Sequence, residues 1–198
     1  MQKPKKYGNL ACIILAGGEG RRLGGVNKAL IPYQEKTLIE HLIASLEPQV
    51  KHFVISANND LDRLSELGHP VVSDDIHAEG PLMGLLSVLK QIEFENIILT
   101  PCDVTAIPFD YVERLTRKLS AGDSDMVIAR TDSQIHYLNC AMRKNIRDKL
   151  ESFIDSGGRG ASEWQKHLAV EYVSFNCLGA VEIFNNINTK EDIEKLGT

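Results

Sequence analysis

Short runs of consecutive apolar residues alternate with amphipathic segments through the first two-thirds of the chain. The runs predict strands at 10–15, 52–57, 70–73, 96–100 and 126–129. The segments between them place apolar residues at helical spacing and predict helices at 37–46, 61–67, 81–92 and 109–119. Because the runs are continuous rather than alternating, both faces of each strand should be buried. This pattern predicts an α/β fold, a single doubly wound and mostly parallel sheet with helices on both faces, similar to a Rossmann fold.

Beyond residue 130 the pattern is less regular. It predicts a strand at 135–142, a helix at 146–154, a glycine-rich loop at 156–160, a short helix at 163–168, a strand at 170–173 and a last helix from about Lys190. The chain contains no repeat, low-complexity tract or linker-like segment. We therefore expect one domain over residues 1–198, which is long enough to bury a substantial core.

Composition narrows the class of protein. The formal net charge of −5 argues against nucleic-acid binding, which normally needs a basic face. The sequence has no apolar run long enough to span a membrane, and its first residues lack the apolar core of a signal peptide. The four cysteines show no C-x-x-C spacing and the six histidines no metal-ligand spacing. We expect a cytoplasmic protein with buried free thiols, no zinc, and no membrane or nucleic-acid partner.

The segment after the first predicted strand is the richest in chemistry. Residues 15–30 read LAGGEGRRLGGVNKAL, with five glycines and the cations Arg21, Arg22 and Lys28. Glycine lets backbone N–H groups approach an anion closely, and the cations supply charge. A plain flexible loop is the alternative, but turns usually need only one or two glycines. The segment therefore predicts a polyphosphate-binding loop.

Two common phosphate-binding motifs do not fit this loop. A Walker loop needs Ser or Thr after its lysine to ligate magnesium, and Lys28 is followed by Ala29. The dinucleotide fingerprint needs a third small residue, where this chain has Leu23. Neither motif therefore accounts for the loop.

Polar residues follow the next predicted strands, and the carboxyl ends of such strands share one edge of the sheet. Asp103 follows the buried run at 96–100, where a carboxylate beside the core is costly unless it has a partner. One well-placed carboxylate suffices for Mg²⁺, because phosphates and water complete the coordination. The alternative, a cap on the helix near Pro108, places Asp103 about five residues too early. Asp103 is the predicted metal ligand.

Asp74 ends the third predicted strand on the same edge. A carboxylate can accept two hydrogen bonds from the N1–H and N2–H₂ groups of guanine, which adenine does not offer. The alternative is a turn aspartate that accepts a hydrogen bond from its own backbone. Asp74 is a candidate nucleotide-binding residue.

The order Leu-Ala-Gly-Gly-x-x-x-Arg-Leu-Gly-Gly-x-x-Lys resembles the signature loop of nucleotidyltransferases, and the pair Gly24-Gly25 before Lys28 most resembles the molybdenum cofactor guanylyltransferases, the MobA family. The Gly-Pro-Leu-x-Gly segment at 80–84, the Pro-Cys-Asp segment at 101–103 and the asparagine-rich stretch at 185–192 are also similar to that family. The family usually has Asp before the lysine, where this chain has Asn27.

This resemblance implies a Mg²⁺-dependent enzyme that transfers GMP from GTP to the phosphate of Mo-molybdopterin and releases pyrophosphate. It implies that Arg22 and Lys28 bind phosphates and that Asp103 binds Mg²⁺ and nucleotide. The remaining nucleotide-binding residues would be Leu15, Ala16, Gly17, Gly18 and Asp74.

The resemblance also implies a pterin side formed by His136, Asn186 and Asn188. His136 could equally be a core or surface histidine, and the asparagines precede a capping box of Thr189 and Asp192. Molybdoenzyme apoproteins or cofactor chaperones are the implied protein partners.

Two other functions remain open at this point. One is a related nucleotidyltransferase that uses CTP or another NTP with a sugar- or cofactor-phosphate acceptor. The other is a non-catalytic adaptor that binds nucleotide or cofactor. The presence of both Lys28 and Asp103 favours an enzyme, because a pure binding protein has less need of both.

Overall fold

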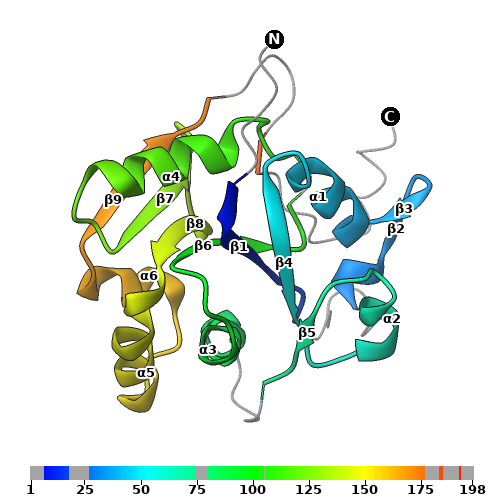
Figure 1. Ribbon diagram of the computed structural model, residues 1–198, viewed down its shortest axis with the longest axis horizontal. Helices are drawn as coiled ribbons and strands as arrows, with labels where there is room; N and C mark the ends of the chain where they lie inside the picture. The colour runs from blue at the N-terminus through cyan, green and yellow to red at the C-terminus, as the bar shows by residue number, and fades with distance from the viewer. Residues whose placement is uncertain are drawn as a thin grey trace.

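The computed structural model of the chain describes residues 7–17, 27–74, 80–104, 106–176, 183–184 and 192. Within this part, a central seven-stranded sheet has the order β5-β4-β1-β6-β8-β7-β9 and helices pack on both of its faces (Figure 1). The strands are β1 (Tyr7–Leu15), β4 (Val50–Ser56), β5 (Val71–Val72), β6 (Asn96–Pro101), β7 (Met126–Arg130), β8 (Ile135–Arg143) and β9 (Val170–Ser174). The predicted α/β class is confirmed.

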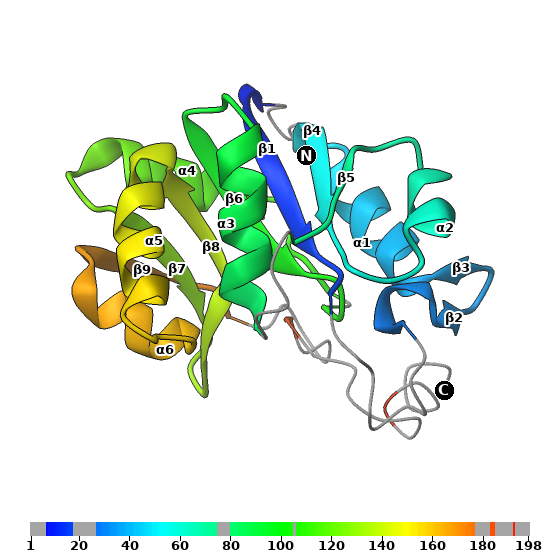
Figure 2. The ribbon, with the colours of Figure 1, turned by 90° about the horizontal axis from the view of Figure 1, so that it is seen from below.

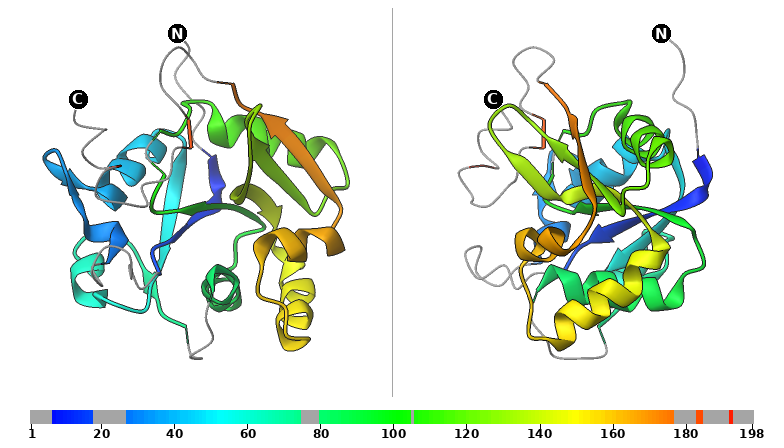
Figure 3. Two further views of the ribbon diagram at one scale, coloured as in Figure 1. Left: turned by 180° about the vertical axis from the view of Figure 1, so that it is seen from behind. Right: turned by 90° about the vertical axis from the view of Figure 1, so that its left-hand side faces the viewer.

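The helices divide into two layers, one on each face of the sheet. Buried side chains of α1 (Leu38–Leu46), α2 (Leu61–Ser65) and α4 (Tyr111–Ala121) form one apolar cluster with the strands. Those of α3 (Pro81–Gln91), α5 (Arg147–Asp155) and α6 (Ala161–Trp164) form the other (Figure 3). Both faces of the central strands β1, β4, β6, β7 and β8 are therefore buried over most of their length, as the continuous apolar runs predicted, whereas the edge strand β9 is only partly buried.

The direction of the strands places six carboxyl ends at one edge of the sheet. β1 lies parallel to β4 and β6, β4 to β5, and β7 to β9. β8 alone among the described strands of this sheet is antiparallel, because the turn at 131–134 is too short for a parallel crossover. Figure 2 shows β1 running toward this edge, which the strand-end rule predicts as the binding edge.

Smaller elements complete the described structure. A 3₁₀ turn at Lys28–Leu30 leads into the hairpin β2 (Pro32–Tyr33) and β3 (Lys36–Thr37), which precedes α1. The helix predicted at 163–168 divides into α6 and a 3₁₀ turn at Gln165–His167, and a further 3₁₀ turn at Lys144–Ile146 precedes α5. The last predicted helix lies outside the described residues except for Asp192.

Two features of composition have structural counterparts. Cys12, Cys102 and Cys140 are buried and free, as predicted, and burial raises the pKa of the Cys102 thiol to about 12. Across the described residues, none of the helices combines the length and apolar character that a membrane span requires.

Candidate functional site

The 3₁₀ turn at Lys28–Leu30 and the segment after β6 bring a lysine and a carboxylate into contact. The Lys28 Nζ atom lies 2.8 Å from the Asp103 Oδ2 atom, and the two side chains are only 20% and 18% exposed. The residues are 75 positions apart in the chain. Asp103 follows β6, and Lys28 begins the 3₁₀ turn at Lys28–Leu30, so the contact joins two segments that lie beyond the strands of the sheet. The structure thus unites two residues that the sequence assigned to one site.

The second oxygen of Asp103 is available to a ligand. Its Oδ1 atom is buried and has no hydrogen-bond partner among the described residues. A buried oxygen left without a donor costs about 1–3 kcal/mol, so a bound cation or donor would recover that free energy. In the described ranges, no three His, Cys, Asp or Glu side chains gather as a metal site. The arrangement fits Mg²⁺, which needs one or two carboxylates when phosphates and water supply the rest.

Asn27 holds the turn that carries Lys28. Its Oδ1 atom accepts a hydrogen bond from the Ala29 N–H at 3.1 Å and caps the 3₁₀ turn. Its Nδ2 atom donates to the Asn59 carbonyl at 3.3 Å, just beyond β4. An aspartate in this place would keep the first contact and lose the second. Asn27 therefore has a structural reason to be an amide in this chain.

The loop residues before the lysine are described in part. The Ala16 N–H donates to the Ser56 carbonyl at 2.8 Å, and the Leu15 carbonyl accepts from the Cys102 N–H at 3.0 Å. Gly17 is exposed, and a Cβ atom there would meet nothing within 4 Å. The backbone of Leu15 and Ala16 is thus held between the ends of β4 and β6. Gly18, Arg21 and Arg22 lie outside the described residues.

Asp74 is tied to Asn58 across the ends of β5 and β4. The Asn58 Nδ2 atom donates to Asp74 Oδ2 at 3.1 Å, and the Asp74 N–H donates to Asn58 Oδ1 at 2.9 Å. The Asp74 Oδ1 atom is buried and, among the described residues, has no hydrogen-bond partner. Asn58 was not among the predicted site residues, although a polar residue directly after a predicted strand could have indicated it.

The first turn of α3 approaches the end of β4 closely. Gly80 has φ +121°, a conformation that favours glycine, and Pro81 follows at the first helical position. A Cβ atom on Gly84 would lie 2.2 Å from Ser56 Oγ and 3.6 Å from Asp74 Oδ1. Gly84 therefore lets the helix backbone lie beside the candidate nucleotide-binding carboxylate.

The predicted pterin side is only partly described. The ring of His136 is buried 4.8 Å from the ring of Phe184, and its Nε2 atom lies 3.5 Å from Thr131 Oγ1. Burial lowers the pKa of His136 below its ordinary value. These contacts are those of a packed histidine. Asn186 and Asn188 lie outside the described residues.

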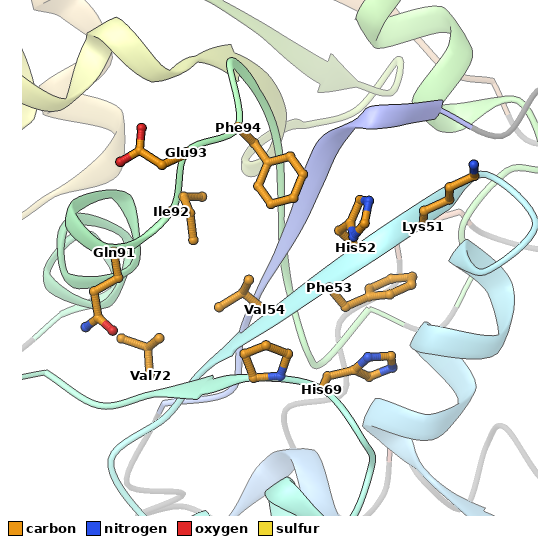
Figure 4. A pocket seen from close by; sticks show the side chains of 11 residues that line it. Lys51, His52, Phe53, Val54, His69, Val72, Gln91, Ile92, Glu93 and Phe94 are labelled. Atoms are coloured by element: carbon orange, nitrogen blue, oxygen red, sulfur yellow. The ribbon is translucent and has the colours of Figure 1, made fainter.

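Two cavities lie elsewhere on the sheet. An open, polar cavity of about 720 Å³ lies where β7 ends, on the same edge as the Lys28–Asp103 pair; it is lined by Arg130, Thr131, Asp132, Ser133, Gln134, Ile135, Tyr137 and Ser174. A more apolar cavity of about 400 Å³ lies at the opposite edge, near the amino end of β4 (Figure 4). There His52 and Val54 of β4 face Ile92 and Phe94. The second cavity is thus separated from the site by the length of the strands.

Comparisons with known proteins identify chains that are similar in sequence and in fold. The family model described as a MobA-like NTP transferase domain matches residues 12–171. A molybdenum cofactor guanylyltransferase of Shewanella halifaxensis is 34% identical over 187 residues, which cover 93% of this chain and 92% of the relative.

Solved structures show the same fold at lower identity. Molybdopterin-guanine dinucleotide biosynthesis protein A from Archaeoglobus fulgidus is similar with a TM-score of 0.74 and 23% identity, covering 93% of this chain and 95% of that chain. A Mycobacterium tuberculosis protein solved as a complex with manganese is similar with a TM-score of 0.71 and 13% identity, covering 95% of this chain and 97% of that chain.

Proposed function

The chain belongs to the MobA-like NTP transferase family, and from this premise we propose that it is a molybdenum cofactor guanylyltransferase. It transfers GMP from GTP to the terminal phosphate of Mo-molybdopterin and releases pyrophosphate. The product is the molybdopterin guanine dinucleotide cofactor. The observation that carries the proposal is the largely buried Lys28–Asp103 pair at the binding edge of the sheet.

The reaction needs positioning and charge stabilisation more than a general base. The attacking phosphate has a second pKa near 6, so it is already largely ionised at neutral pH. Lys28 and Arg22 bind the triphosphate and stabilise the charge that develops on the α-phosphate and the leaving pyrophosphate. The backbone of Leu15, Ala16, Gly17 and Gly18 binds the nucleotide and orients it for in-line attack.

Asp103 is the proposed ligand of Mg²⁺. The cation, when bound, would neutralise phosphate charge and fix the geometry of the triphosphate. The unpartnered Oδ1 atom of Asp103 supports this role, because it can accept a ligand while Oδ2 remains with Lys28. Asp74 is the proposed base-binding residue, and its own Oδ1 atom has no hydrogen-bond partner among the described residues.

The acceptor occupies the remainder of the same edge. Guanylyl transfer requires its terminal phosphate to lie near the α-phosphate of GTP, beside Lys28 and Asp103. His136, Asn186 and Asn188 are the proposed pterin-side residues, with His136 acting from its packed position beside Phe184. Molybdoenzyme apoproteins or their cofactor chaperones are the proposed recipients of the product.

Nucleotide selectivity provides the first test. Melting temperature should rise more with Mg²⁺ and GTP than with CTP, UTP or ATP, because a ligand that binds only the folded state stabilises it. Pyrophosphate release should then require both GTP and molybdopterin. A preference for CTP or UTP would exclude guanylyl transfer, and nucleotide binding without pyrophosphate release would indicate an adaptor.

A further inference from the structure

The side chain of Asn58 holds Asp74, the proposed base-binding residue, through hydrogen bonds. β5 pairs with β4 over only two residues, Val71 and Val72, and the last backbone contact runs from the Ala57 N–H to the Val72 carbonyl at 3.0 Å. Beyond that point the side chain of Asn58 takes over, because its amide oxygen accepts the Asp74 N–H at 2.9 Å. The side-chain amide of Asn58 thus takes the place of the next backbone hydrogen bond between β4 and β5.

The two contacts fix the orientation of the Asn58 amide. Its Nδ2 atom donates to Asp74 Oδ2 at 3.1 Å while its Oδ1 atom accepts from the Asp74 backbone. A flipped amide would set donor against donor and oxygen against oxygen, so the hydrogen bonds permit only one assignment. One side chain therefore holds both the backbone and the carboxylate of Asp74.

These two hydrogen bonds also fix the position of the other carboxylate oxygen of Asp74, which lies beside Gly84. The Oδ1 atom is buried, lies 3.6 Å from the position of a Cβ atom on Gly84, and has no hydrogen-bond partner in the described part of the chain. Oδ2 keeps a lone pair available beside it, since a carboxylate oxygen accepts more than one hydrogen bond. The two carboxylate oxygens of Asp74 thus present two acceptors in one plane, which matches the adjacent N1–H and N2–H₂ donors of guanine.

We propose that Asn58 is the positioning residue for guanine selectivity, acting through Asp74 and not on the reacting phosphates. The proposal rests on guanylyl transfer as the activity of this site. If the Asp74 carboxylate were free to rotate, it would still attract a base that carries N–H donors. It would no longer be aligned to accept hydrogen bonds from both N1–H and N2–H₂ of guanine. Selectivity for the exocyclic amine therefore depends on Asn58.

Asn58→Asp provides the sharpest test, because it is nearly isosteric and sets a carboxylate oxygen against Asp74 Oδ2. Binding is measured for three probes with Mg²⁺: GTP, ITP, which lacks the exocyclic amine, and inorganic tripolyphosphate. We expect GTP affinity to fall about tenfold to a hundredfold. The GTP-to-ITP affinity ratio should move toward one, with tripolyphosphate affinity unchanged and kcat at saturating GTP preserved.

Controls separate positioning from folding. Asn59→Ala alters the neighbouring amide side chain, keeps the backbone carbonyl, and should retain the wild-type GTP-to-ITP ratio. Asn58→Ala removes both hydrogen bonds without adding charge, and it should show a smaller shift of that ratio in the same direction. Melting temperatures of the nucleotide-free variants establish that each protein is folded; if Asn58→Asp is unfolded, Asn58→Ala decides the test.

Two results would overturn the proposal. One is a wild-type GTP-to-ITP affinity ratio in both Asn58 variants. The other is a loss of tripolyphosphate affinity as large as the loss of GTP affinity, which would indicate that the whole site is disrupted. Failure of the proposed function looks different, because the wild-type protein itself would then prefer another base or release no pyrophosphate.

Discussion

Lys28 and Asp103 neutralise each other in the structure, although the proposed reaction assigns them different partners. Their contact at 2.8 Å keeps two charges in a largely buried place before any ligand arrives. When triphosphate and Mg²⁺ bind, the lysine gains phosphate oxygens and the carboxylate gains a cation. The free protein thus holds the two charges as a pair, and removing either member disturbs the charge balance around the other.

Replacing Lys28 with alanine should reduce kcat rather than only raise KM. Loss of a group that stabilises developing charge costs about 2.7–4 kcal/mol in the transition state. Steady-state kinetics of pyrophosphate release measures both constants. Lys90→Ala is the matched control. Lys90 is a half-exposed lysine in the last turn of α3, where it pairs with Glu151 of α5. An effect confined to KM would contradict the role of Lys28.

Asp103→Ala should reduce turnover severely, and raising the Mg²⁺ concentration should not restore it fully. The variant also removes the carboxylate that pairs with Lys28, so its melting temperature is measured alongside its activity. Asp103→Asn separates these effects, since the amide keeps the size of the side chain and lacks the charge that a cation needs. Activity of Asp103→Ala at the wild-type level would remove this residue from the site.

At the scale of elements, the start of α4 depends on a side chain far away in sequence. Asp110 provides no side-chain cap, and the Val112 N–H donates instead to Gln49 Oε1 at 3.0 Å. The Nε2 atom of Gln49 donates to the Pro108 carbonyl at 3.1 Å, and the side chain is buried. One glutamine before β4 thus satisfies both an N–H and a carbonyl group at this helix entry.

Gln49→Ala should lower the free energy of unfolding by about 1–3 kcal/mol, because it leaves buried backbone groups without partners. Chemical denaturation measures the change. Gln49→Glu retains an acceptor for the Val112 N–H but sets a buried carboxylate oxygen against the Pro108 carbonyl, so it should cost at least as much. Equal stability of Gln49→Ala and wild type would show that water replaces the lost contacts.

The approach of α3 to β4 predicts coupling between two positions. Gly84→Ala would place a methyl group 2.2 Å from Ser56 Oγ, and such overpacking typically costs about 1–3 kcal/mol. Ser56→Ala removes the clashing oxygen, so the double variant should be more stable than the sum of the single changes predicts. Denaturation of all four proteins measures the coupling; strict additivity would rule out the clash with Ser56 Oγ as the source of the cost.

At the scale of the whole molecule, the sequence predicted the layers of the fold better than it predicted the side-chain contacts beyond the strand ends. Continuous apolar runs indicate strands that are buried on both faces, and this pattern was enough to predict a sheet covered by helices on both sides. The Asn58–Asp74 pair depends on how the ends of β4 and β5 are aligned, and the Lys28–Asp103 pair joins a 3₁₀ turn to the segment after β6. The local sequence pattern indicates neither contact. Gln49 likewise caps a helix 63 residues later in the chain. The functional roles of all the predicted site residues remain predictions, and Arg22, Asn186 and Asn188 lie outside the described residues as well.

Stability should fall between pH 7 and pH 5 in part because of His136. Burial lowers its pKa from the ordinary value of 6.5, so the folded state favours the neutral ring. Its contribution to stability is fully present above that value and is lost as the pH falls and the unfolded state takes up a proton. His136→Phe keeps an aromatic ring beside Phe184 and should show a smaller fall in unfolding free energy. An identical pH dependence would show that other groups cause the fall.

The tight space between Gly84 and Ser56 also has an evolutionary consequence. A lineage that acquires any side chain at position 84 must first, or soon afterwards, lose the hydroxyl at position 56 or move it to another rotamer. The two positions should therefore covary among related chains, even though they lie on different elements of the fold. Because the same gap borders Asp74, drift at this pair would also alter the space available to the base, and so link a packing constraint to the choice of nucleotide.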